Sequence, residues 1–233
     1  MRQIFLDTET TGLSPDNGDR VIEIGCVELL HRKLTGNNMH FYLSPGSDSH
    51  EEALRVHGIS NEFLRDKPVF SAIADELMAY LAGAEIIIHN APFDVGFLNK
   101  ELQLIGRGPF TDIAGSIVDT LAMAKEMYPG KRNGLDALCD RLDVDNSGRT
   151  LHGALLDAEL LADVYINMTR GQDALLMDAG SQEQTVGAAS RVDLSRFDLT
   201  VLVANESEVA AHDDVLTQLD KASGGKTVWR VAV

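Results

Sequence analysis

Two acidic residues near the N-terminus, Asp7 and Glu9, have the types and the spacing that suit metal-ion chemistry. They follow residues 3–6, Gln-Ile-Phe-Leu, whose β-branched and aromatic side chains predict a buried strand. Successive side chains of a strand alternate between its faces, so residues two apart project on the same side. Neighbouring carboxylates repel each other unless a cation lies between them, and hard cations such as Mg²⁺ prefer oxygen ligands. We expect half of a metal site at the end of this strand, although a solvated strand end has the same pattern.

Two further acids and a histidine occur where a strand or a loop gives way to a helix. Asp94 follows a short apolar strand, at the start of a helix predicted over residues 92–104. Active sites of α/β proteins gather at such strand ends. His152 precedes a long amphipathic helix predicted over residues 153–170, and Asp157 lies one turn inside it among apolar neighbours. A buried carboxylate needs a partner, and the absence of Lys or Arg four residues away favours a metal ligand at Asp157.

Together these residues could carry out two-metal phosphoryl chemistry: Asp7, Glu9, Asp94, Asp157 and His152. Four carboxylates can hold two divalent ions about 3.5–4 Å apart, one to activate water and one to stabilise the leaving oxygen. A histidine, whose ordinary pKa lies near neutrality, is the natural general base. Taken singly, Asp94 could instead be a helix cap, and His152 could be an ordinary loop histidine.

The elements that must position these residues form an α/β domain over residues 1–170. A short apolar run, residues 85–89, is typical of a parallel strand. Other strands are predicted over residues 21–30 and 39–43, with a turn signal at 36–38. Further helices are predicted over residues 69–81, 120–127 (capped by Asp119) and 135–142.

The character of the chain changes after the long helix. Residues 171–190 are rich in Gly, Ala, Ser, Gln and Asp, which predicts a flexible linker. Beyond it the pattern predicts a strand over 199–204, a helix over 206–219 and a strand over 227–231. Because this small unit is too short for a secure core of its own, we expect residues 191–233 to dock onto a partner.

Composition limits the possible function classes. The chain of 233 residues has no apolar run long enough for a membrane span and no signal-peptide pattern. Its two cysteines, Cys26 and Cys139, match no metal spacing, so we expect reduced thiols and a cytoplasmic protein. The net charge of −16 leaves no marked basic stripe for gripping nucleic acid. Metals or a partner would have to help hold such a substrate, and the charge would equally keep any protein soluble.

Three motifs resemble those of the DEDDh family of 3′–5′ exonucleases: Asp-Thr-Glu-Thr-Thr-Gly at 7–12, His-Asn-Ala-Pro-Phe-Asp at 89–94, and His-x₄-Asp at 152–157. The resemblance implies a ribonuclease-H-like mixed sheet flanked by helices. It implies two Mg²⁺ or Mn²⁺ ions bound by Asp7, Glu9, Asp94 and Asp157, with His152 as the general base. It also implies contacts with a DNA 3′ end from Thr10, Thr11, Gly12, Leu13, His57, Asn90 and Phe93. Leu13, His57 and Phe93 could equally be core or turn residues.

A narrower resemblance covers nearly the whole chain. Val-His-Gly-Ile at 56–59 and the segment 202–230, with Gly-Gly-Lys-Thr-Val-Trp-Arg at 224–230, are similar to the proofreading subunits of bacterial DNA polymerase III. The resemblance implies that residues 191–233 bind the alpha polymerase subunit, and a small accessory subunit could bind the nuclease domain. We expect a proofreading exonuclease; the alternatives are an exonuclease acting on RNA 3′ ends and a mainly structural bridging subunit.

The predicted linker contains one further motif. Gln-Asp-Ala-Leu-Leu-Met at 172–177 is similar to the sliding-clamp binding motif of these subunits, with Met177 in place of the usual aromatic residue. The resemblance implies clamp contacts from Gln172, Leu175 and Met177. An apolar patch at a helix end is the alternative.

Overall fold

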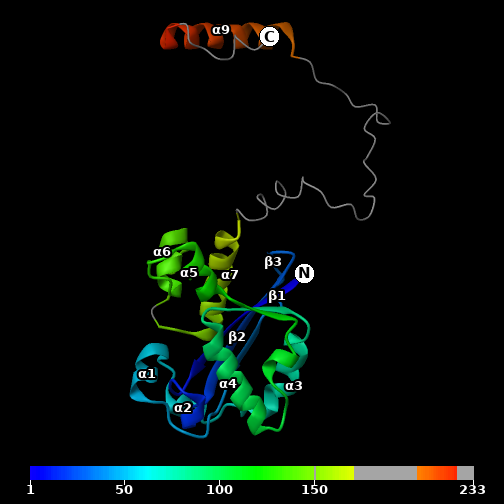
Figure 1. The fold of residues 1–233 in the computed structure, drawn as a ribbon, viewed down its shortest axis with the longest axis vertical. Helices are drawn as coiled ribbons and strands as arrows, with labels where there is room; N and C mark the ends of the chain where they lie inside the picture. Colours follow the sequence, from blue (N-terminus) through cyan, green and yellow to red (C-terminus); the bar gives the residue numbers. More distant parts are fainter. Residues whose placement is uncertain (150, 171–203, 225–233) are drawn as a thin grey trace, which may run out of the picture. The chain divides into compact units, whose positions relative to one another are not determined.

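The computed structural model describes residues 1–149, 151–170 and 204–224 (Figure 1). The chain divides into two units, Met1–Gln182 and Glu183–Val233, and each is described by itself. The linker predicted over 171–190 and the strand predicted over 227–231 lie outside the described residues, as does nearly all of the strand predicted over 199–204. Among the described helices, none is both long enough and apolar enough to cross a membrane.

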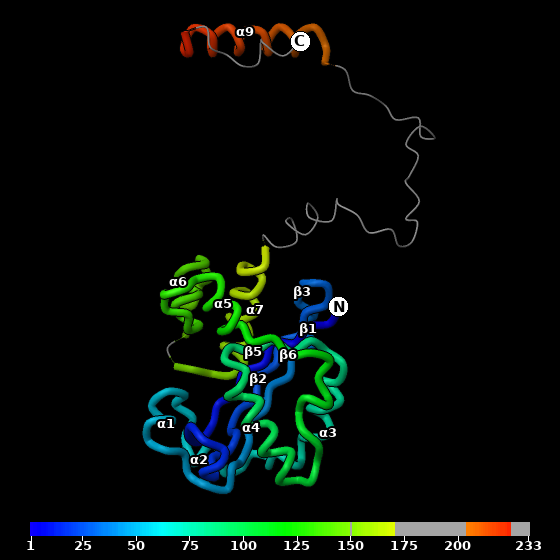
Figure 2. The backbone as a smooth tube through the Cα atoms, viewed as in Figure 1, coloured from blue at the N-terminus to red at the C-terminus, as the bar shows by residue number. Residues whose placement is uncertain are grey.

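A mixed sheet forms the centre of the first unit. Its strand order is β3-β2-β1-β5-β6, and β4 also pairs with β2. β1 runs antiparallel to β2 and parallel to β5, which in turn runs parallel to β6. The path of the chain through these strands is drawn in Figure 2. The strands are β1 (Arg2–Thr10), β2 (Val21–Leu30), β3 (Lys33–Leu34), β4 (Met39–Tyr42), β5 (Glu85–Ile88) and β6 (Ser116–Asp119).

β1 is longer than the strand predicted over residues 3–6. β2 pairs with it as far as Thr10, whereas β5 pairs only with residues 3–5. The expectation that Asp7 and Glu9 follow the end of the strand is therefore wrong, because pairing with the long strand β2 extends β1 past both. They lie within β1, beyond the last residue that pairs with β5.

The hairpin turn also lies earlier than its sequence signal. The chain reverses at His31 and Arg32, which have φ values of 51° and 63° and join β2 to β3. The predicted turn at residues 36–38 instead connects β3 to β4, and both of these strands pair with β2.

Helices cover the sheet: α1 (Glu51–His57), α2 (Asn61–Leu64), α3 (Phe70–Leu81), α4 (Ala91–Leu104), α5 (Thr120–Met127), α6 (Leu135–Leu142) and α7 (Ala154–Met168), with short 3₁₀ turns at Pro15–Asn17 and Phe110–Asp112. The predicted cap of α5 is confirmed, because the Asp119 carboxylate accepts hydrogen bonds from the backbone N–H groups of Leu121 and Ala122. The sequence pattern did not predict α1 or α2.

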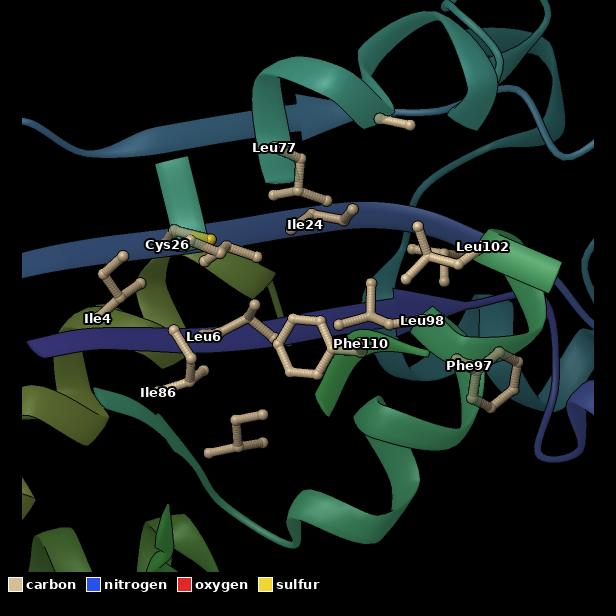
Figure 3. Packing of buried hydrophobic residues seen from close by; sticks show 14 of the residues in the cluster. Ile4, Leu6, Ile24, Cys26, Leu77, Ile86, Phe97, Leu98, Leu102 and Phe110 are labelled. Atoms are coloured by element: carbon tan, nitrogen blue, oxygen red, sulfur yellow. The ribbon is translucent and has the colours of Figure 1, made fainter. Parts of the chain in front are cut away.

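The alternation of side chains along β1 divides the core into two layers. Ile4 and Leu6 pack with apolar residues of α3 and α4 (Figure 3). Phe5 instead packs with residues of β2 and α7, including Ala158 and Leu161. Because side chains two apart share a face, Asp7 and Glu9 continue the face that α7 covers.

Gly25 allows α7 to approach the sheet beside Asp7. It lies opposite Asp7 in the register of β1 and β2. A Cβ atom at this position would lie 2.2 Å from the backbone carbonyl carbon of Ala154, the first residue of α7. The first turn of α7, which carries Asp157, is therefore held close to β1 by a contact that only glycine permits.

In the second unit the structure describes one helix, α9 (Glu206–Ser223). It begins with a capping box, in which Asn205 and Glu208 each bond to the backbone N–H of the other. It ends at Gly224, whose φ of 65° is left-handed. The predicted helix over 206–219 is thus confirmed and is four residues longer.

Candidate active site

The five residues predicted to carry chemistry line one cleft of about 510 Å³. Asp7 and Glu9 come from β1, Asp94 from the first turn of α4 and Asp157 from the first turn of α7. His152 precedes α7. The fold therefore brings together side chains from three distant parts of the chain.

Asp94 reaches the cleft because α4 begins where β5 stops. Its side chain is buried, and the Thr8 hydroxyl donates a 2.7 Å hydrogen bond to Asp94 Oδ1. Asn90, before the helix, has a left-handed φ of 69°, and its backbone N–H donates to Asp119 Oδ1 at 3.1 Å. The same Asp119 carboxylate thus fixes the starts of both α4 and α5.

The donor atoms of the cleft fit a divalent metal ion. Ligand atoms of Glu9, His152 and Asp157 lie within 4.8 Å of one another. The carboxylates of Asp7 and Asp94 line the same cleft. Hard divalent cations favour such oxygen-rich, closely spaced sets, so a metal ion can be held here.

The electrostatics of the cleft also favour a bound cation. Burial raises the pKa of Asp7 well above its ordinary value, and the charges of Asp94, Asp157 and Glu9 raise it further. Burial, then Asp157 and Glu23, raise the pKa of Glu9 to about 8. Burial is also the main reason that the pKa of Asp94 rises to about 7. A nearby positive charge would lower all three pKa values.

Arg149 supplies one such charge, and it corrects the expectation that Asp157 has no basic partner. Arg149 Nε donates to Asp157 Oδ1 at 2.5 Å, and Nη2 donates to Oδ2 at 2.7 Å. Nη1 donates to Asp136 at 2.5 Å. Local spacing could not reveal this partner, because Arg149 lies eight residues before Asp157 and reaches it through a loop.

Arg149 also contacts the predicted base. Its Nη2 lies 2.8 Å from Nδ1 of His152. A guanidinium can only donate, so this contact requires an unprotonated Nδ1. Nδ1 is also the ring atom that faces Asp157, at 3.5 Å from Oδ2. Arg149 therefore engages the nitrogen lone pair that a general base would use.

The predicted substrate loop is held by internal hydrogen bonds. The buried Thr10 hydroxyl donates to the Gly12 carbonyl at 2.6 Å, and the Thr11 hydroxyl accepts from the Arg20 N–H at 3.0 Å. Leu13 is 80% exposed. Gly12 and Leu13 line a separate hollow of about 420 Å³, whereas Thr10 and Thr11 line neither the cleft nor this hollow.

Asp19 organises this loop and was not predicted. Its carboxylate accepts from the Ser14 N–H at 2.9 Å and bonds to His50 Nε2 at 2.9 Å. A Cβ atom on Gly12 would lie 2.5 Å from Asp19 Oδ2, so the loop lies directly against this carboxylate. A single acid in a turn gives no sequence signal for such a role.

The other predicted substrate residues lie in different surroundings. Phe93 lines the cleft. His57 is buried, and its Nδ1 accepts from the Ile59 N–H at 2.9 Å. Within the described parts of the chain, His57 Nε2 has no hydrogen-bond partner. Asn90 is exposed beside α4. The predicted clamp residues, Gln172, Leu175 and Met177, lie outside the described residues.

Comparison with known proteins identifies similar sequences over nearly the whole chain. A family model described as Exonuclease matches residues 4–165. The DNA polymerase III subunit epsilon of Pasteurella multocida is 51% identical, covering 98% of this chain and 93% of the relative. The same subunit of Escherichia coli strain K12 is 49% identical, covering 98% of this chain and 97% of the relative.

Solved structures share the fold at lower identity. Exonuclease X in complex with 5′ overhanging duplex DNA superimposes with a TM-score of 0.58 at 24% identity, over 73% of this chain and 93% of that chain. Escherichia coli Exonuclease I in complex with a dT13 oligonucleotide gives 0.64 at 18% identity, over 76% and 43%. The predicted mixed sheet with flanking helices is therefore confirmed as the fold of these exonucleases.

Proposed function

Because this chain belongs to the Exonuclease family and to the epsilon subunits of DNA polymerase III, we propose that its acidic cleft removes mispaired 3′-terminal nucleotides from DNA. The chain is a 3′–5′ DNA exonuclease of the proofreading type. The observation that carries the assignment of the site is the meeting of four carboxylates and one histidine in one cleft.

Asp7, Glu9, Asp94 and Asp157 would hold two divalent ions, Mg²⁺ or Mn²⁺. When bound, such a pair of ions lowers the pKa of water and stabilises the leaving oxygen. Burial, and after it repulsion between neighbouring acids, raises the pKa values of Asp7 and Glu9, which supports this assignment. Repulsion among buried acids is the condition under which a cation binds most favourably.

His152 acts as the general base through Nδ1, once the Arg149 guanidinium that contacts this atom has withdrawn. It takes a proton from the attacking water, whose oxygen forms a bond to the terminal phosphorus. The bond from that phosphorus to the preceding 3′ oxygen breaks, and this oxygen takes up a proton. The products are a nucleoside 5′-monophosphate and a DNA strand one nucleotide shorter.

The terminal nucleotide would lie between the cleft and the loop at residues 10–13. Phe93 in the cleft and exposed Leu13 at the neighbouring hollow are suited to contact a base. His57 and Asn90 would contact the same strand. A mismatched end unpairs at a lower cost than a matched end, by a few kcal/mol or less, so selectivity can come from delivery of frayed ends.

Residues 191–233 would bind the alpha subunit of the polymerase, and Gln172, Leu175 and Met177 would contact the sliding clamp. Within the described residues, α9 supports a docking role. Its Val209, Val215 and Leu219 are 49%, 54% and 46% exposed, so these apolar side chains are accessible to a binding partner. A small accessory subunit on the nuclease domain and a cytoplasmic location complete the proposal.

Substitution of single carboxylates tests the site. Asp7→Asn and Asp157→Asn should each abolish release of nucleoside 5′-monophosphates from end-labelled DNA, since each removes a metal-binding charge. Asp75→Asn, at an exposed carboxylate paired with Arg107, is the matched control and should retain activity. Undiminished hydrolysis by either cleft variant would refute the assignment.

Docking is tested separately in the full chain. Val209→Asp with Leu219→Asp should weaken binding to purified alpha subunit by at least tenfold, while hydrolysis of short DNA is retained. Leu34→Asp, at an exposed apolar residue of β3, is the control. Unchanged affinity of the double variant would refute the docking role of α9.

A further inference from the structure

Positive side chains without an acidic partner gather on one side of the catalytic cleft. Of the twelve other described Lys and Arg residues of the first unit, half form ion pairs with acids: Arg2, Arg20, Arg55, Lys100, Arg107 and Arg149. Lys125, Lys131 and Arg132 form no ion pair with any described residue, although the chain has a net charge of −16. All three are exposed and lie within eight residues of one another.

This basic group adjoins the cleft. Arg132 lines both the cleft and a neighbouring hollow of about 440 Å³, which Lys131 also lines. Ala137 and Asp140 also line both the cleft and the hollow, so the hollow continues the cleft. Burial lowers the pKa of His89, a cleft residue, and the charges of Arg149 and Lys125 lower it further. Lys125 therefore also lies within electrostatic reach of the cleft.

The loop that carries Lys131 and Arg132 is fixed by its neighbours. The Arg141 guanidinium lies 4.7 Å from the Tyr128 ring centroid and donates to the Arg132 carbonyl at 2.8 Å. It also donates to Asn133 Oδ1 at 3.1 Å, and the Asn133 amide donates to the Tyr128 carbonyl at 3.3 Å. The backbone is thus held by Arg141, which leaves the side chains of Lys131 and Arg132 free to bind a ligand.

The chemistry of the surroundings indicates the ligand. Asp136 and Asp140 add to the four carboxylates of the cleft, so an entering polyanion is repelled unless fixed cations offset them. A DNA strand whose 3′ end lies in the cleft must pass its preceding phosphates over the rim. Phosphate contacts by Lys and Arg supply most of the sequence-independent affinity for nucleic acid.

We propose that Lys131 and Arg132 form a basic rim that binds the backbone phosphates preceding the terminal nucleotide of the substrate strand. This inference rests on the proposed exonuclease function. It assigns the entry side of the DNA, which neither the motifs nor the carboxylate cleft specify. An acidic protein segment is the other anionic occupant, but continuity with the cleft favours the strand being cut.

The test measures kcat/KM on single-stranded DNA of two, four and eight nucleotides for the wild-type chain and for Lys131→Ala with Arg132→Ala. The variant should lose little on the dinucleotide and about tenfold on the octanucleotide, because only longer strands reach the rim. For this variant on the octanucleotide, the slope of log(kcat/KM) against log[salt] should also become shallower by about 1.4, or roughly 0.7 for each lost phosphate contact.

Matched variants separate this effect from general loss of charge or fold. Lys33→Ala with Arg65→Ala removes two exposed cations that line neither the cleft nor the hollow, and should match wild type at every length. Lys131→Arg with Arg132→Lys keeps both charges, so its kcat/KM on the octanucleotide should recover most of what the double alanine variant loses.

Two results would overturn the proposal that the rim binds the substrate strand. One is a double alanine variant with wild-type rates at all lengths, and the other is a loss equal at all lengths. An inactive wild-type chain would instead refute the proposed function, so the two failures are distinguishable.

Discussion

Arg149 and Asp157, which both line the acidic cleft, form a bidentate ion pair with N–O distances of 2.5 and 2.7 Å. Both side chains are nearly buried, at 6% and 4% exposed. Although burial opposes its charge, hydrogen bonds and charges from Asp157 and Asp136 raise the pKa of Arg149, so it stays a cation. The guanidinium occupies the two carboxylate oxygens that a metal ion would need. Arg149 and a metal ion at Asp157 are therefore competing counterions.

Removal of Arg149 should change stability most when metal is absent. In Arg149→Met, Asp157 loses its partner among other buried acids, and breaking such a pair costs about 3 kcal/mol. Thermal unfolding in a chelator should therefore shift to lower temperature. Added Mn²⁺ should raise the Tm of this variant more than that of wild type, because no internal cation competes with it.

A matched substitution controls for the loss of an arginine. Arg107→Met breaks an exposed pair with Asp75 and should change neither the Tm in chelator nor the response to Mn²⁺ by more than a small amount. Equal Mn²⁺ responses in Arg149→Met and wild type would contradict the competition.

The raised pKa values predict a pH dependence of stability in the metal-free protein. In the unfolded chain Glu and Asp have pKa values of about 4, whereas folded Glu9 and Asp94 reach about 8 and about 7. The folded state therefore binds more protons in this window, and stability falls as pH rises from about 5 through 7 and 8. Each group contributes a slope of up to about 1.4 kcal/mol per pH unit.

Urea unfolding in chelator at several pH values measures this dependence. Glu9→Gln removes one titrating group and should flatten the decline between about pH 5 and pH 8. Saturating Mn²⁺ should also reduce it, because ligands bind metal in the ionised form. A wild-type free energy of unfolding that rises across this window would contradict the raised pKa values, because ionised carboxylates would then not destabilise the folded state.

His152 should affect turnover rather than metal affinity. His152→Gln removes the positioned base and should lower kcat by about 10²–10⁴-fold. The affinity for Mn²⁺, measured by calorimetry without DNA, should stay close to that of wild type, although His152 lies near Glu9 and Asp157. His31→Gln is the exposed control. A fall in Mn²⁺ affinity of more than about tenfold would identify His152 as a metal ligand instead.

Gly25 should control the position of Asp157 through α7. In Gly25→Ala the new methyl group would lie 2.2 Å from the backbone of Ala154, so α7 must move away from the sheet. We expect a loss of about 1–3 kcal/mol in unfolding free energy and a lower kcat, because Asp157 moves relative to Asp7.

A helical glycine with open space provides the contrast. Gly96→Ala in α4 meets nothing within 4 Å and should stabilise the protein by about 0.4–1 kcal/mol with activity retained. If Gly25→Ala were as stable and as active as Gly96→Ala, the close approach of α7 would be unimportant.

Elements with a strong local pattern were predictable from the sequence. β2 has the predicted bounds because apolar residues occupy most of its positions, and α6 and the Asp119 cap also follow local rules. The helices α1 and α2 were missed because they are short and bury few residues, such as His57 and Leu64. The extension of β1 past Asp7 depends on pairing with β2, which no local signal reports.

The same distinction applies to the cleft. Its carboxylates and histidine were predicted because they lie in short motifs of neighbouring residues. Arg149, Asp19 and Arg132 were not predicted as cleft or loop residues, since each acts through a loop that folds back on distant parts of the chain. Asp157 was expected to lack a basic partner for this reason, and only the fold reveals its contact with Arg149.

Anomalous diffraction from crystals of the full chain soaked in Mn²⁺ tests the central claim most directly. The account predicts Mn²⁺ density bounded by Asp7, Glu9, Asp94 and Asp157, with the Arg149 guanidinium withdrawn from the Asp157 carboxylate. Saturating Mn²⁺ that binds elsewhere, while Arg149 keeps its two hydrogen bonds to Asp157, would contradict it.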